Sequence, residues 1–293
     1  METGARRVIV MADAETPGRT MGFSRIAVLT TCLLVGLPAG AENRVGAPLP
    51  ADDRVTFDYQ VYFGGMNVMQ LGVEVGVSPD AYDLTARVQT IGFAGFVAPW
   101  KSVATSEGSI DAGRVEPRQH RVHGEYRGNT RTTAIDFDDN GEVRAVVLQP
   151  PPGKGPNDQV PEALRRGAID PPSALFAVTR LMAQDGKCEG RMRVFDGRRR
   201  YDVVLTDRGR ETLIANDYSA YRGAALRCDF RFEPIVSEYV AQPEHKRRFR
   251  SGRAWFAELI PGRPVVPVRL EIDGDYAQTL VHLSELPRAT AAR

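Results

Sequence analysis

The sequence lacks a large charge of either sign, and it has almost no long apolar runs. Its 293 residues carry 38 Lys and Arg against 37 Asp and Glu, a formal net charge of +1. A chain so close to neutrality has no global field to attract nucleic acid, so nucleic-acid binding is not expected. Only one stretch is apolar and uncharged for more than ten residues, which excludes a protein that crosses the membrane several times. The 42% hydrophobic content is that of a folded globular chain.

The one apolar run has the form of an export signal. Arg25 precedes the uncharged residues 26–37, and small residues follow at 38–41. This order is typical of a secretory signal peptide, and the run is short for a transmembrane helix, which needs about 20 residues. Residues 1–41 are therefore predicted to be a signal peptide, with Met21 as the expected true start. The mature protein is predicted to be periplasmic, with no membrane span and a net charge of zero.

Two other interpretations of this segment stay open. The apolar run could remain uncleaved as an anchor. Cys32 could be a lipidation site, since residues 29–32 loosely resemble a lipobox. Thr31 is bulkier than the small residue usual at that position, and most of the apolar run follows Cys32, so lipidation is the weaker alternative.

Cysteine is scarce, and Cys32 lies in the predicted signal peptide, which leaves Cys188 and Cys228. Two cysteines in an exported protein most often pair, so these two are predicted to form a disulfide. A loop of this length would stabilise the fold by about 4 kcal/mol in the chain-entropy approximation. The alternatives are two free buried thiols or a redox pair, and the absence of a Cys-x-x-Cys motif argues against the latter.

Alternating hydrophobicity dominates the mature chain. Val55, Phe57, Tyr59, Val61 and Phe63 alternate with more polar residues, and residues 69–77 repeat the pattern after a Gly-Gly turn. About twelve such strands follow one another with hairpin-like connections. The predicted fold is mainly β, an antiparallel meander curled into a roll or open barrel.

One segment breaks this pattern. Residues 150–172 hold seven prolines and predict a long irregular connection. Residues 173–183 carry apolar residues at helical spacing behind Asp170 and two prolines, which predicts one central helix. The predicted organisation is a linker at 42–52, a single β-roll domain at 53–286 with the Pro-rich connection and helix at 150–183, and a flexible tail at 287–293.

Several short motifs give the chain a family resemblance. They are Tyr59 through Leu71-Gly72, Cys188 followed by Val194-Phe195-Asp196-Gly197-Arg198-Arg199-Arg200-Tyr201, Tyr221-Arg222-Gly223 leading to Cys228, Ala254-Trp255-Phe256-Ala257, and Val266-Pro267-Val268-Arg269. In this order and spacing the chain resembles the exported bacterial family called "domain of unknown function 3108". The resemblance implies an envelope protein of β-rich fold, related in general shape to lipid-binding or lipoprotein-carrier rolls. It implies no activity and no catalytic residues.

Motifs for metal, cofactor or nucleophilic chemistry are weak. His120 and His123 lie three residues apart in a predicted strand and so face opposite sides, which leaves His123 and Glu125 as two ligands at most. No metal site and no cofactor is predicted. Residues 151–155 lack the upstream Gly and the Ser or Thr of a phosphate-binding loop, and there is no Gly-x-Ser-x-Gly.

Two segments are candidate contact sites. Phe93, Phe96 and Trp100 lie in an apolar stretch broken by Gly and Pro, which either borders an apolar ligand or partner surface or plugs one end of the core. The run Arg198, Arg199, Arg200 either contacts an anion or forms a solvated hairpin tip.

The resulting hypothesis is an exported, non-enzymatic protein that binds a lipid or other apolar ligand, or an envelope component. The alternative is a structural module with an envelope protein partner. A third hypothesis is a hydrolase, which would gain if His120 or His123 met a carboxylate and a Ser in one cleft.

Overall fold

A computed structural model describes residues 54–153, 159–214, 216–236, 251–274 and 276–287. The predicted signal peptide, the linker and most of the tail lie outside these residues. The strands, in chain order, are β1 Arg54–Phe63, β2 Met66–Val77, β3 Ala81–Thr90, β4 Trp100–Asp111, β5 Arg114–Tyr126, β6 Asn129–Phe137, β7 Val143–Gln149, β8 Gly190–Phe195, β9 Arg200–Leu213, β10 Gly223–Val236, β11 Ser251–Ala257, β12 Val266–Ile272 and β13 Thr279–Leu283. The helices are α1 Gly92–Val97, α2 Glu162–Arg165 and α3 Pro171–Asp185.

The strands form one antiparallel sheet in the order β7-β6-β5-β4-β3-β2-β1-β13-β12-β11-β10-β9-β8. Strands that follow one another in the chain are neighbours in the sheet, with the exception of β7 and β8. β1 pairs with β13, with Tyr59 opposite Leu283, which joins the first half of the meander to the second. β7 and β8 are the two edges and do not pair. The predicted mainly β meander with one substantial helix is confirmed.

Alternation along the strands builds the core as the sequence predicts. In β1, Phe57, Tyr59 and Val61 are buried, while Thr56 and Asp58 are exposed. The buried side chains pack with residues of β11, β12 and β13, among them Trp255 and Leu283. One face of the sheet therefore carries the apolar interior.

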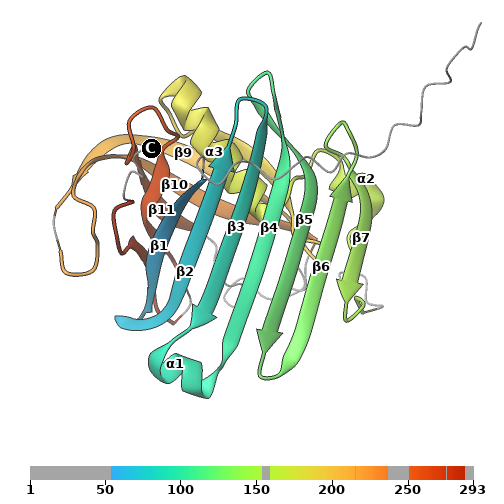
Figure 1. The fold of residues 1–293 in the computed structure, drawn as a ribbon, viewed down its shortest axis with the longest axis horizontal. Helices are drawn as coiled ribbons and strands as arrows, with labels where there is room; N and C mark the ends of the chain where they lie inside the picture. The colour runs from blue at the N-terminus through green and yellow to red at the C-terminus, as the bar shows by residue number, and fades with distance from the viewer. Residues whose placement is uncertain (1–53, 154–158, 215, 237–250, 275, 288–293) are drawn as a thin grey trace, which may run out of the picture. The chain divides into compact units, whose positions relative to one another are not determined.

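Helix α3 lies against β3, β4, β5 and β8 (Figure 1). Asp170 caps its N-terminus by accepting a hydrogen bond from the Ser173 amide at 3.0 Å, and prolines occupy the first positions, where no amide donor is needed. Gly186 ends it with φ 66°, the left-handed conformation that glycine adopts without strain. The predicted helix is thus present and two residues longer at each end.

The two edges of the sheet approach each other through side chains. Phe195 of β8 packs in one buried cluster with Ile135 and Phe137 of β6. The β8–β9 turn comes so near that a Cβ on Gly197 would lie 2.6 Å from a methyl carbon of Thr133. Packing rather than strand pairing therefore curls the sheet into an open roll.

Candidate functional site

An apolar cavity of about 370 Å³ lies between the sheet and α3. Strands β1, β2, β3, β12 and β13 form its walls, together with α3 and the β11–β12 connection. Its lining comprises Val55, Phe57, Tyr59, Leu71, Val73, Val75, Val77, Leu84, Thr85, Ala86, Pro171, Pro172, Leu175, Phe176, Thr179, Leu259, Ile260, Arg263, Pro264, Val265, Val266, Pro267, Leu270 and Val281. A volume of this size is within the range of ligand pockets, about 300–1,000 Å³.

The periodicity of each element puts these residues in one place. Every second residue of β2 from Leu71 to Val77 faces the cavity, because strand side chains alternate between the two faces. On α3, Leu175 and Thr179 lie four residues apart and so share one face of the helix. The alternation of apolar residues along the strands predicts an apolar interior. Whether the helix fills that interior depends on how the elements pack in three dimensions.

Polar groups are few in this cavity. The Thr179 hydroxyl donates to the Phe176 carbonyl at 2.8 Å, so it is already satisfied. Burial raises the pKa of the Tyr59 phenol well above its usual range, so this group is neutral. Among the described residues that line the cavity, Arg263 alone carries a charge, and there is no Ser, Cys, His or carboxylate. The cavity is therefore suited to holding an apolar molecule, and its lining offers no nucleophile with an adjacent base.

A buried polar cluster lies beside the N-terminus of α3. The Ser106 hydroxyl donates to Asp170 Oδ1 at 2.6 Å and lies 2.8 Å from His120 Nδ1. His120 Nδ1 is also 3.5 Å from Asp170 Oδ1. Next to them, the Tyr82 and Ser173 hydroxyls are 2.7 Å apart. Ser106 and His120 are 2% exposed and Asp170 is 0% exposed, so the cluster is closed to solvent.

This cluster brings a Ser, a His and an Asp together, the combination the hydrolase hypothesis requires, but not in a cleft. Burial lowers the pKa of His120, and the neighbouring Asp170 carboxylate partly opposes that shift. The serine hydroxyl and the carboxylate both meet the same ring nitrogen, whereas a catalytic triad uses one nitrogen for each. The cluster ties the start of α3 to β4 and β5 and thereby positions one wall of the cavity.

Sequence reasoning recognised only part of this cluster. Asp170 was expected at the helix start, and His120 was expected to face away from His123. His120 is indeed buried while His123 is exposed. The link from Ser106 to Asp170 spans 64 residues and has no local signal in the sequence. Among the residues that the structure describes, no three His, Cys, Asp or Glu side chains gather as metal ligands would.

The three aromatics singled out in the sequence lie at the other end of the strands from the cavity. Phe93 and Phe96 belong to α1, which joins β3 to β4, and they are 75% and 86% exposed. Trp100 begins β4 and is half-buried. None of the three lines the cavity. The expectation that this segment plugs the core is wrong, because no residue of α1 is buried.

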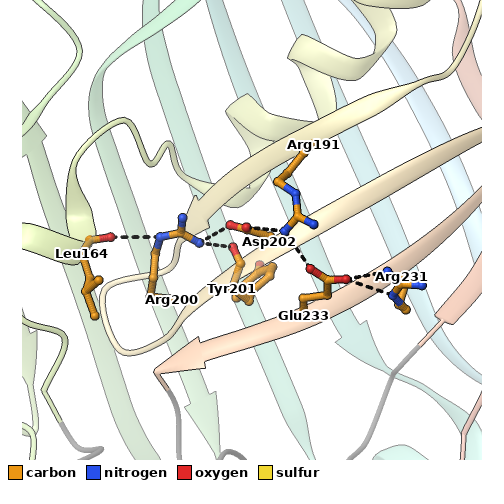
Figure 2. A network of polar contacts seen from close by, with 7 residues as sticks. All are labelled: Leu164, Arg191, Arg200, Tyr201, Asp202, Arg231 and Glu233. Carbon is orange, nitrogen blue, oxygen red and sulfur yellow. Dashed lines mark hydrogen bonds and ion pairs between the residues drawn. The ribbon is translucent and has the colours of Figure 1, made fainter.

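The three arginines of the run at 198–200 lie in different surroundings. Arg198 and Arg199 lie in the β8–β9 turn, where Asp196 accepts hydrogen bonds from both of their amides. Arg200 is buried and donates to the Leu164 carbonyl and to Asp202, and thus does not present its charge to an anion in solution. Figure 2 shows that this pair belongs to a longer network across β8, β9 and β10, in which Arg191 bridges Asp202 and Glu233 at 2.7 Å each. The network also includes Arg231, which pairs with Glu233.

Cys188 and Cys228 form the predicted disulfide, with their Cα atoms 5.7 Å apart. Both are buried and pack with Val178 and Met182 of α3. The bond thus joins the end of the helical connection to β10. No helix in the described ranges is both long and apolar enough to cross a bilayer.

Fold and cavity together define a mainly β roll with an apolar cavity, partly open to solvent, between the sheet and one helix. Residues 58–281 match the family described as "Protein of unknown function (DUF3108)", and the chain belongs to that family. No curated protein matches the sequence. Among solved structures, the chain is similar to the "Crystal Structure of Beta-barrel-like Protein of Domain of Unknown Function DUF1849 from Brucella abortus". The identity is 11% and the TM-score 0.45, with 79% of this chain and 95% of that chain covered.

Proposed function

We propose that this protein is an exported, periplasmic, non-enzymatic binding protein that holds an apolar ligand in the cavity under α3. The observation that carries the proposal is the almost wholly apolar lining of a cavity of about 370 Å³. A fully packed roll has few voids larger than a water molecule. The lining offers water few hydrogen-bond partners, so an apolar ligand would gain free energy by covering these walls.

The size of the cavity narrows the ligand class. At about 370 Å³ the cavity is near the lower end of the range of ligand pockets, about 300–1,000 Å³. A single alkyl chain or a small terpenoid suits this size better than a two-chain lipid.

The first test is to purify the protein from its own envelope under native conditions and to analyse an organic extract by mass spectrometry. A stoichiometric apolar molecule would support the proposal and identify its class. A clean extract would not be sufficient by itself to refute it, since a ligand can be lost during purification, so the stripped protein is also titrated with a fluorescent single-chain fatty acid.

The titration includes a variant that fills the cavity and a matched control. Ala86→Phe adds a ring to a residue that lines the cavity, and Thr56→Phe adds the same ring at an exposed position on β1. We expect Ala86→Phe to weaken binding at least about tenfold and Thr56→Phe to leave it unchanged. Equal binding by both variants, or no binding by the wild type, would refute the proposal and favour a structural module with a protein partner.

A further inference from the structure

The end of the sheet opposite the cavity carries a cluster of exposed apolar side chains, called here the apolar tip. Three neighbouring segments supply it: the β1–β2 turn, helix α1 and the β5–β6 turn (Figure 1). Its members are Phe63, Met66, Phe93, Phe96, Val97 and Tyr126, all of them exposed. None of these residues lines the cavity.

Contacts join the three segments into one surface. On one side of α1, the Ile91 amide donates to the Val68 carbonyl of β2 at 2.9 Å. On the other side, the Arg127 guanidinium donates to the Val97 carbonyl at 3.0 Å, and its amide donates to the Pro99 carbonyl. Strand β2 and the β5–β6 turn therefore flank α1 at this end of the sheet.

Helix α1 is built the opposite way from an ordinary surface helix. Its small residues face the sheet: a Cβ on Gly95 would lie 3.1 Å from the Thr90 carbonyl oxygen. Its two phenylalanines point outward at 75% and 86% exposure. A helix that stabilised only its own fold would bury the large side chains and expose the small ones. An exposed apolar surface of this kind marks a contact site for a partner or a membrane.

The charged residues near the apolar tip distinguish a membrane from a protein as its contact. Residues 63–66, 91–100 and 126–129 contain one charged side chain, Arg127, whose guanidinium lies 5.4 Å from the ring centre of Tyr126. Lys101 and Arg131 follow at the bases of the neighbouring strands, and the one acid beside them, Glu125, pairs with Lys101. In these three segments, aromatic and apolar side chains stand in front of Arg127 and Arg131, an arrangement that matches the headgroup region of an anionic bilayer. The neighbouring β12–β13 turn, which reaches Gly64 through Gln278, adds one described acid, Asp273.

We propose that the apolar tip inserts Phe93 and Phe96 into the interfacial region of a lipid bilayer. Arg127 and Arg131 then lie at the level of the anionic headgroups. In this orientation the opposite end of the strands, and hence the cavity, points away from the membrane surface. This inference concerns a surface separate from the cavity and stands whether or not the cavity holds a ligand.

Trp100 provides a local readout, because it directly follows α1, and Trp255, the other tryptophan of the chain, is buried. The protein is mixed with vesicles of phosphatidylglycerol and phosphatidylcholine that carry brominated acyl chains, and tryptophan quenching is measured. Three proteins are compared: the wild type, F93S/F96S, and the control V147S/I214S, which replaces two exposed apolar residues outside the tip. Because Trp100 reports only on its own surroundings, attachment through another part of the chain does not imitate the signal.

We expect quenching in the wild type and in V147S/I214S. In F93S/F96S we expect vesicle affinity to fall about tenfold or more, since the two phenylalanines that would be buried in the bilayer are lost. Binding of the fluorescent fatty acid should be the same in all three proteins, which separates this result from a failure of the proposed function. Wild-type protein without quenching, or F93S/F96S quenched as strongly as the wild type, would overturn the inference. The inference would also be overturned if a protein partner bound the apolar tip and the protein did not bind vesicles.

Discussion

Asp170 is the residue whose replacement best tests how α3 is held over the cavity. Its Oδ1 atom accepts hydrogen bonds from the Ser173 amide and from the Ser106 hydroxyl. Loss of an N-cap costs about 0.5–2 kcal/mol, and loss of a hydrogen bond to a charged group costs about 1.5–3 kcal/mol. Asp170→Ala should therefore lower the free energy of unfolding by about 2–5 kcal/mol.

Two companion variants separate the contributions. Asp170→Ser keeps a side-chain oxygen for the cap but is too short to reach Ser106, so it should recover about 1 kcal/mol of the loss. Asp138→Ala is the matched control, because Asp138 also accepts two backbone hydrogen bonds, from the amides of Asn140 and Glu142, but in a turn where it is only partly buried. It should cost about 1 kcal/mol, since water replaces the lost bonds.

Urea denaturation followed by tryptophan fluorescence measures all four proteins. The affinity for the fluorescent fatty acid should fall in Asp170→Ala and stay unchanged in Asp138→Ala, because only the former loosens a wall of the cavity. If Asp170→Ala were no less stable than Asp138→Ala, the reasoning that the buried cluster anchors α3 would be refuted.

Three other predictions follow from the same structure. Replacing Cys188 and Cys228 together by Ala should lower the free energy of unfolding by about 4 kcal/mol. The same denaturation assay measures this variant and the reduced wild-type protein, and the two should be equally stable. Burial lowers the pKa values of His120 and His282, so the unfolded chain binds protons more readily, and stability should fall as the pH drops through their unfolded pKa of about 6.5. His120→Gln should flatten this pH dependence; an unchanged slope would contradict the assignment. Arg200→Met should destabilise the fold by up to about 3–5 kcal/mol, because it leaves a buried carboxylate with one partner fewer, and thermal unfolding measures it.

The strands and the long helix could be predicted because their signals are local. The alternation in residues 55–63 sets which side chains β1 buries, and Asp170 with two following prolines marks where α3 begins. The disulfide could be predicted because the predicted mature chain has only two cysteines. These predictions needed no knowledge of which strand lies beside which.

The cavity and the buried cluster could not be predicted, since both depend on contacts between distant segments. Ser106 and Asp170 meet only because the connection after β7 returns across the face of β4 and β5. Arg200 looked like part of an exposed cationic turn, yet its position as the first residue of β9 buries it against the Leu164 carbonyl. Helix α1 was missed because two glycines and a proline in nine residues favour a loop, and the helix is only six residues long.

The number of strands in the described sheet fixes the relative direction of its two edge strands, β7 and β8. Twelve antiparallel pairings separate the two edge strands, so β7 and β8 run in the same direction. Parallel neighbours cannot be joined by a hairpin and need a crossover connection, usually through a helix. A crossover therefore links the two edge strands, and it carries α3, the one long helix of the described chain, which lies against β3, β4, β5 and β8. With one strand more or fewer, the two edge strands would run in opposite directions, and a short hairpin turn could join them.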